Sequence, residues 1–163
     1  MGKLDSEIRL DILSESSIDA AITAVEHKIK ECRQFLKNAV KRGGKIGMSL
    51  VKDELSSSTN GSKNLQQSIV NYQSGYTCTI TSYEPYAIYV EYGTGVVGAN
   101  GVKHPELPPG WRYAIGKTIN PKTGVWKYQK HGLWFSTRGQ QAHRFMYNAK
   151  VRLLDKLDEV WND

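Results

Sequence analysis

The feature that most constrains this chain is a row of apolar residues that recurs at alternating steps of four and three along its first third. The row begins at Ile18 and ends at Ala39 or Val40, and its other members are Ile22, Val25, Ile29, Cys32 and Leu36. This spacing places every member on one face of an α-helix. The spacing therefore predicts one long amphipathic helix in the first third of the chain.

The residue types at both ends of the row predict where this helix begins and ends. Ser16 followed by Asp19 resembles a capping box, and Gly43-Gly44 supplies a C-terminal stop. We expect the helix to span about residues 17–42. Cys32 lies on the apolar face, so we expect it in the core as a small hydrophobic residue.

Composition indicates one folded domain. The 163 residues are 39% hydrophobic and 23% charged, which is typical of a globular chain, and we assign residues 1–163 to a single domain. No run approaches 18 consecutive apolar residues, and the N-terminus lacks the apolar centre of a secretion signal. We expect a soluble intracellular product, no membrane partner, and two reduced cysteines, Cys32 and Cys78.

Short strands are predicted after the first helix. A polar loop is expected at residues 56–62, followed by a hairpin of residues 68–72 and 76–81. Residues 86–92 form either a short helix or a third strand, because so short an apolar run cannot be typed by periodicity. Gly93 ends that element in either case.

The second half of the chain predicts another hairpin and a closing helix. Residues 112–119 and 125–129 flank a turn sequence at 120–124, within an insertion arm that spans about residues 96–132. Residues 140–161 then show helical spacing. The predicted class is α+β: two amphipathic helices on a small, mainly antiparallel sheet, with a basic aromatic hairpin insertion.

Positive charge is concentrated in one segment. Residues 96–144 carry eight basic side chains against one acidic residue, Glu106, whereas residues 1–95 are balanced. The same segment holds most of the tryptophans, together with other aromatic residues: Trp111, Tyr113, Trp126, Tyr128, Trp134 and Phe135. Two interpretations stay open, contact with nucleic acid or an arm whose aromatic residues are buried between subunits.

The sequence offers no coherent catalytic or metal-binding constellation. Residues 93–98 match the glycine spacing of a dinucleotide-binding turn, but glycine and proline follow where that turn needs a helix. His104, His131 and His143 lack the spacing of a zinc site. Glu91 is expected to be an ion-pair or interface residue, since no spacing brings it to His104 or His143. We therefore expect no enzyme activity, no cofactor and no metal.

Two short motifs resemble those of a known family. The first is Tyr86-Ala87-x-Tyr89-Val90-Glu91-Tyr92-Gly93-Thr94-Gly95, and the second is Phe135-x-Thr137-x-Gly139-Gln140-x-Ala142-x-x-Phe145-Met146-x-x-Ala149. In this order, between two helices, they resemble the tail-component, or neck, family of long-tailed bacteriophages and prophages. The family commonly has proline where this chain has Arg144.

The resemblance implies a structural virion protein without enzymatic activity. Such a protein is a ring-forming adaptor, hexameric in expectation, at the head-tail junction or tail terminus, made in the host cytoplasm. Its partners are further copies of itself, the head connector and the tail tube. The expected interface residues are Tyr86, Tyr89, Glu91, Tyr92, Thr94, Trp111, Trp126 and Trp134. The expected structural residues are Gly93, Gly95 and Gly139, which permit turns, Phe145 and Met146, which pack inward, and Gln140 and Ala142.

The alternative is a nucleic-acid-binding module formed by the basic aromatic segment 103–138. Its lysines would contact phosphates, and its affinity for DNA would fall steeply with salt. The expected contacts are Lys117, Lys122, Lys127 and Lys130. If the protein is an adaptor through which DNA passes, we expect this basic arm outside the channel, because a strongly positive lumen would retard the DNA.

Overall fold

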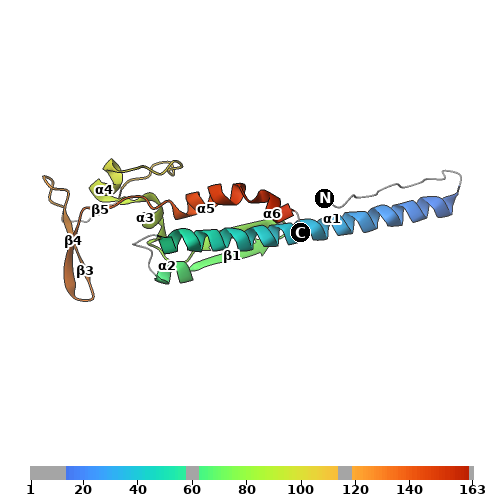
Figure 1. Cartoon of the computed structure of the whole chain (residues 1–163), viewed down its shortest axis with the longest axis horizontal. Helices are drawn as coiled ribbons and strands as arrows, with labels where there is room; N and C mark the ends of the chain where they lie inside the picture. The colour runs from blue at the N-terminus through green and yellow to red at the C-terminus, as the bar shows by residue number, and fades with distance from the viewer. Residues whose placement is uncertain (1–13, 58–62, 114–118, 162–163) are drawn as a thin grey trace.

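The computed structural model describes residues 14–57, 63–113 and 119–161, which form an elongated α+β molecule, as predicted (Figure 1). Of the helices in these ranges, none combines the length and apolar composition that crossing a bilayer requires. The elements follow in this order: α1 (Glu15–Ser57), α2 (Lys63–Gln67), β1 (Ile69–Ser74), β2 (Thr77–Ser82), α3 (Ala87–Tyr92), α4 (Gly95–Asn100), β3 (Trp126–Lys130), β4 (Leu133–Thr137), β5 (Gly139–Gln140), α5 (Phe145–Leu154) and α6 (Leu157–Trp161).

α1 is longer than predicted, because it continues without interruption through Gly43-Gly44. A glycine inside a helix costs about 1 kcal/mol relative to alanine, which is why the pair predicts a stop. Here the small residues let other elements approach α1 closely. Cys78 of β2 lies against Gly44, and Ile80 lies against Gly47. Packing against the strands therefore outweighs the local preference, and the predicted end at residue 42 was wrong.

The ends of α1 also differ from the prediction. α1 begins at Glu15, so Ser16 and Asp19 lie inside the helix instead of capping it. At the other end, Ser56 and Ser57 of the predicted loop at 56–62 belong to the last turn of α1. Residues 58–62 of that loop lie outside the described part of the chain.

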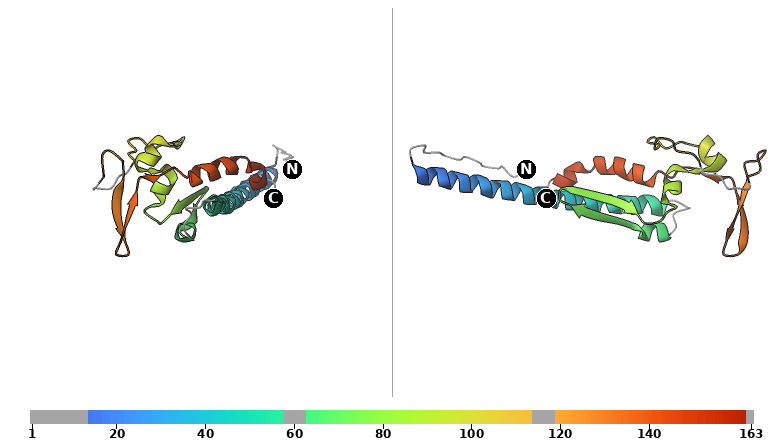
Figure 2. Two further views of the ribbon diagram at one scale, coloured as in Figure 1. Left: turned by 60° about the vertical axis from the view of Figure 1, so that its left-hand side comes forward. Right: turned by 180° about the vertical axis from the view of Figure 1, so that it is seen from behind.

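The first half of α1 extends away from the other described elements, which gather around its second half (Figure 2). The apolar row, expected in the core, is therefore mostly exposed: Ile22 keeps 53% of its surface in contact with solvent. The exposed members are Ile18, Ile22, Val25, Ile29, Cys32 and Leu36. The prediction of a buried Cys32 was wrong, and only the end of the row, at Ala39, is fully buried.

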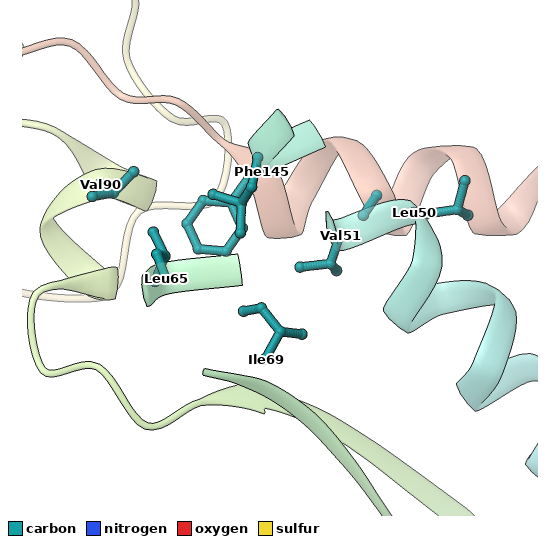
Figure 3. Packing of buried hydrophobic residues seen from close by; sticks show 8 residues of the cluster. Leu50, Val51, Leu65, Ile69, Val90 and Phe145 are labelled. Atoms are coloured by element: carbon teal, nitrogen blue, oxygen red, sulfur yellow. The ribbon is translucent and has the colours of Figure 1, made fainter. Parts of the chain in front are cut away.

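The core lies between the second half of α1, the hairpin of β1 and β2, and the C-terminal helices. Phe145 is its largest fully buried side chain, and Figure 3 shows it close to Leu65 and Val90. The buried cluster consists of Leu50, Val51, Leu55, Leu65, Ile69, Val90, Phe145 and Ala149. Met146 packs against this cluster, so the predicted inward packing of Phe145 and Met146 is confirmed.

The first predicted hairpin is confirmed. β1 and β2 are antiparallel, and their register pairs Ile69 with Ser82 and Ser74 with Thr77. Side chains on one face of β2, at Cys78 and Ile80, lie against the glycines of α1. Because Gly44 and Gly47 have no side chains, the hairpin can lie close to α1.

In the second hairpin, the strand that pairs with β3 is not the predicted one. β3 pairs with β4 in antiparallel orientation, joined by His131 and Gly132, which both adopt positive φ. Residues 120–124 do form a turn, closed by the amide of Asn120 donating to the Val125 carbonyl at 2.8 Å. Residues 111–113 and 119 are not strand, and residues 114–118 lie outside the described ranges. The projecting hairpin is therefore residues 126–137, which extends beyond the predicted arm of residues 96–132.

The predicted closing helix over residues 140–161 divides into three parts. β5 comes first, then α5 and α6, which are separated by a turn at residues 155–156. A short helix that the sequence did not predict, α4, begins inside the glycine-rich stretch at Gly95. α4 ends at Asn100, just before Gly101, so the long helix that a dinucleotide-binding turn needs does not follow these glycines.

Two neighbouring glycines of α1 should respond oppositely to alanine. A Cβ at Gly44 would overlap the Cys78 sulfur, so we expect Gly44→Ala to lower the free energy of unfolding by about 1–3 kcal/mol. A Cβ at Gly43 would lie 3.6 Å from Val160, an ordinary contact. Gly43→Ala should therefore raise the free energy of unfolding by about 0.5–1 kcal/mol. Urea unfolding followed by circular dichroism measures both; a stabilising Gly44→Ala would contradict the close packing of α1 on β2.

Candidate functional site

The candidate site is the place where the two sequence motifs meet. The first motif forms α3 and the turn after it, which Gly93 makes possible with φ of 82°. The second motif forms β5 and the start of α5. Val90 and Glu91 point into the protein, whereas Tyr86 and Tyr89 remain partly exposed. The segment 86–92, left open between helix and strand, is thus a helix from Ala87 to Tyr92.

Backbone contacts join the two motifs directly. Thr94 forms an antiparallel bridge with Gln140, and Gly95 forms one with Gly139. The Gln140 side-chain amide donates to the Tyr89 carbonyl at 3.1 Å. Farther along, the amide of His143 donates to the Val90 carbonyl at 2.9 Å. Segments about fifty residues apart in the sequence therefore behave as one unit.

Glycine is required at this junction because the backbones lie too close for a side chain. A Cβ at Gly139 would overlap the Thr94 carbonyl oxygen, and Gly139 also has φ of 96°. A Cβ at Gly93 would lie 2.8 Å from the amide nitrogen of Ala142. At Gly95, the space of a Cβ is taken by the ring of Trp126. The predicted turn role of these three glycines is confirmed, and close approach is a second reason for each.

Glu91 holds the start of α5. Its side chain is only 5% exposed, and its two oxygens accept the backbone amides of Met146 at 2.8 Å and Tyr147 at 3.0 Å. These amides have no partner inside the helix, and the N-terminal end of a helix favours negative charge. Arg144, which precedes α5, adopts the left-handed conformation with φ of 57° and so turns the chain into the helix.

His104 is the third partner of Glu91. Its Nε2 lies 2.8 Å from Oε1 of Glu91, and its Nδ1 accepts the backbone amide of Glu106 at 2.9 Å. Because Nδ1 accepts a hydrogen bond, the ring proton is on Nε2, which donates to the carboxylate. His104 is as buried as Glu91. No spacing in the sequence indicates that these two residues meet, but the structure brings them together.

Aromatic rings surround this buried pair. His104 lies edge-on to Tyr92 and Tyr147, at centroid distances of 4.6 and 5.2 Å. Trp111 packs beside Tyr92 at 5.0 Å and Tyr89 at 6.1 Å. Burial raises the pKa of the Tyr92 hydroxyl, and the negative charges of Glu91 and Glu106 raise it further. The cluster shields the hydrogen bonds of Glu91 from water.

The structure divides the predicted interface residues into two groups. Glu91 is buried within the chain, so the expectation that it contacts another subunit was wrong. Trp111 and Trp126 are partly buried against residues of their own chain, Tyr92 and Gly95 respectively. The side chains left outward are Tyr86, Tyr89 and, most of all, Trp134, which is 68% exposed. Thr94 is occupied by its bridge to Gln140.

The hairpin of β3 and β4 projects from the junction and has two different faces (Figure 1). Residues opposite each other in an antiparallel pair share a face. One face, called the apolar face here, carries Tyr128 stacked on Phe135 at 5.6 Å, and the register adds the pair of Leu133 with Lys130 beyond them. The other carries the pairs Lys127 with Ser136 and Gln129 with Trp134. Tyr128, Leu133 and Phe135 are all exposed.

The predicted nucleic-acid contacts are scattered. Lys122 lies in the turn at residues 120–124, and Lys127 lies on the polar face of the hairpin; both are exposed. Lys130 ends β3, paired with Leu133. Lys117 lies outside the described residues. Of the four, the structure therefore places only Lys127 and Lys130 on a common element.

The hydrogen bonds that Glu91 and His104 already make limit the chemistry of this site. Both oxygens of Glu91 already accept N–H groups, and its partner His104 is equally buried, so the pair is not presented to a substrate. Among the described residues, no three histidine, cysteine or carboxylate side chains gather as metal ligands would. The arrangement fixes the start of α5 and the loop at His104.

Comparisons of the chain with protein-family models, with curated proteins and with solved structures find no match.

Removing the charge of Glu91 should destabilise the whole fold. Glu91→Gln preserves the shape but leaves two helix amides and His104 with a weaker or mismatched acceptor, so we expect a loss of about 2–4 kcal/mol in the free energy of unfolding. The matched control is Glu106→Gln, which removes an exposed ion pair with Lys150 and should cost less than about 1 kcal/mol. Urea unfolding distinguishes them; equal losses would contradict the central role of Glu91.

Proposed function

We propose that the protein is a structural virion component without enzymatic activity: a ring-forming adaptor, hexameric, at the head-tail junction or tail terminus of a tailed phage or prophage. The observation that carries this proposal is the projecting hairpin of β3 and β4, whose apolar face has no cover within the described chain. An isolated two-stranded hairpin is at best marginally stable in water. A neighbouring molecule that covers it would supply the missing burial.

Ring closure needs two different patches on each subunit, so that the first patch of one subunit binds the second patch of the next. The apolar hairpin face of Tyr128, Leu133 and Phe135 is the first patch. We assign the second to the outward side of α3, where Tyr86, Ile88 and Tyr89 are exposed. Tyrosine suits such a surface because it buries a large ring while its hydroxyl stays hydrogen-bonded.

The motifs that resemble the phage neck family support the same proposal. Their residues hold the hairpin at a fixed position, through Trp126 on Gly95 and the bridges of β5, so that one subunit would present its arm to the next in a constant orientation. The partners in this proposal are further copies of the chain, the head connector and the tail tube. Assembly takes place in the host cytoplasm, and the product remains in the virion.

The apolar hairpin face provides the test. We expect Leu133→Glu/Phe135→Glu to abolish the rings that the wild-type protein forms alone or on connector-bearing heads and tail tubes, because carboxylates cannot be buried there without partners. Negative-stain electron microscopy measures this. The control, Gln129→Glu/Ser136→Glu, adds the same charge to the other face of the hairpin and should leave rings intact. Absence of rings and of added density with wild-type protein would contradict the adaptor function.

A second candidate function, nucleic-acid binding, is favoured by one observation. The polar face of the hairpin combines Lys127 with the exposed ring of Trp134, and a lysine beside an aromatic ring suits a phosphate and a stacked base. We expect replacement of Lys117, Lys122, Lys127 and Lys130 by alanine to abolish salt-dependent binding to a fluorescent DNA oligonucleotide. Binding that is unchanged in this variant would reject the candidate.

A further inference from the structure

We propose that the exposed half of α1 pairs with α1 of a second copy of this chain, in antiparallel orientation, as a short coiled coil. The evidence begins with the spacing of the exposed row. Alternating steps of four and three give a seven-residue repeat, which is the pattern of helices that wind around each other. From Ile18 to Leu36 the row extends about 27 Å along the helix. The inference does not depend on the adaptor function, because it concerns α1 alone.

The buried half of α1 indicates that the occupant of this face is a helix. The row continues beyond Leu36 through Ala39 and Gly43, and there α6 lies against it, with Val160 of α6 3.6 Å from the Cβ position of Gly43. Phe35 marks the boundary, since its ring contacts Trp161 at the end of α6. At Gly43 this face is thus covered by a helix, beside the strand contacts of Gly44 and Gly47, whereas no described element covers the exposed row.

A groove lies where the covered and exposed halves meet. It has a volume of about 330 Å³ and is mostly apolar. α1, α6 and the segment from the turn before β2 to Ile80 form most of its lining, and α5 adds Leu153. The residues from α1 are Ala39, Val40, Gly43 and Gly44, and those from α6 are Leu157, Val160 and Trp161. A helix lying on the exposed row would therefore bring its end to a preformed apolar pocket.

The side-chain sizes fit a second α1 that runs in the opposite direction. In antiparallel coiled coils the two kinds of core position alternate across the interface, so large residues can face small ones. One register places the large residues of the N-terminal half opposite the smaller residues near the groove. Two of its layers lie wholly within the exposed row, Val25 on Leu36 and Ile29 on Cys32. Its end brings Ile18 and Ile22 of the second copy to the groove that Gly43 and Ala39 line.

Charge complementarity selects the same register and direction. Acidic residues flank the start of the row and basic residues flank its end, so antiparallel helices bring opposite charges together. In this register Glu26 of each copy lies beside Arg33 of the other. Within the described chain neither side chain has an ion-pair partner. A parallel pair would instead place Lys28 beside Arg33 on both sides of the seam, which is repulsive.

Analytical ultracentrifugation tests the pairing in the background Leu133→Glu/Phe135→Glu, where contacts through the hairpin are removed. We expect dimers, and we expect Ile22→Lys/Ile29→Lys to weaken them more than about 100-fold, because each lysine enters two symmetry-related layers. The control, Ala20→Lys/His27→Lys, adds the same charge to the opposite face of the helix and should leave the dimer unchanged. A monomer at all concentrations would overturn the proposal and assign the row to another occupant, residues 1–13 or a different protein.

Disulfide trapping tests the direction in a Cys78→Ala background. One protein keeps Cys32, and the second carries Ile29→Cys/Cys32→Ser; copper phenanthroline is the oxidant. In the antiparallel register the thiol introduced at position 29 faces Cys32 of the other protein, so we expect crosslinked dimers only when the two proteins are mixed. Crosslinking of each protein alone would overturn the antiparallel arrangement.

A charge exchange tests the register. We expect Glu26→Arg to weaken the dimer and Glu26→Arg/Arg33→Glu to restore it. A double variant that does not restore the dimer would overturn the register.

Discussion

The buried carboxylate of Glu91 is the interaction on which the rest of this structure depends. It accepts two amides at the start of α5 and the Nε2 proton of His104, so one side chain of α3 binds two other segments of the chain. α5 in turn packs Phe145 and Ala149 against α1 and completes the core. Burying a carboxylate costs free energy unless all of its hydrogen bonds are made. The buried Glu91 is therefore stable only when α5 and His104 are both in place. The same carboxylate thereby determines where α5 begins and where the loop at His104 is anchored.

Much of the fold could be predicted from local patterns, and the failures have identifiable physical causes. The long helix followed from periodicity, and the β1–β2 hairpin followed from β-prone residue types on both sides of a turn sequence. The end of α1 could not be predicted, because Gly43 and Gly44 are tolerated only where other elements pack against that helix. The partner of β3 was also missed, since the turn at residues 120–124 is a stronger local signal than His131-Gly132. At the site, the glycines were recognised, whereas His104 was not: nothing in the spacing of Glu91 and His104 shows that they meet in space.

The two uncovered apolar surfaces differ in the kind of association that they favour. In the proposed ring, contacts between the hairpin face and the outward side of α3 would relate subunits head to tail, because these are different surfaces. In the proposed pairing of α1, the same surface of both copies would meet, so the two copies would be related by a two-fold axis. The surfaces lie at opposite ends of an elongated subunit, as Figure 2 shows, and both can be occupied at once. In combination they would join two rings, or hold subunits as pairs before ring formation.

The antiparallel bridges between Thr94–Gly95 and Gly139–Gln140 have a mechanical consequence. The hairpin leaves the body of the protein between these two segments, with Trp126 seated on Gly95 at its base. A force applied to the tip of the hairpin is therefore transmitted through these few hydrogen bonds to the start of α5, and from there to α1. Little of it can be absorbed by local bending, because the glycine contacts at the junction leave no free space. A displacement of the arm would therefore reach the long helix through this junction.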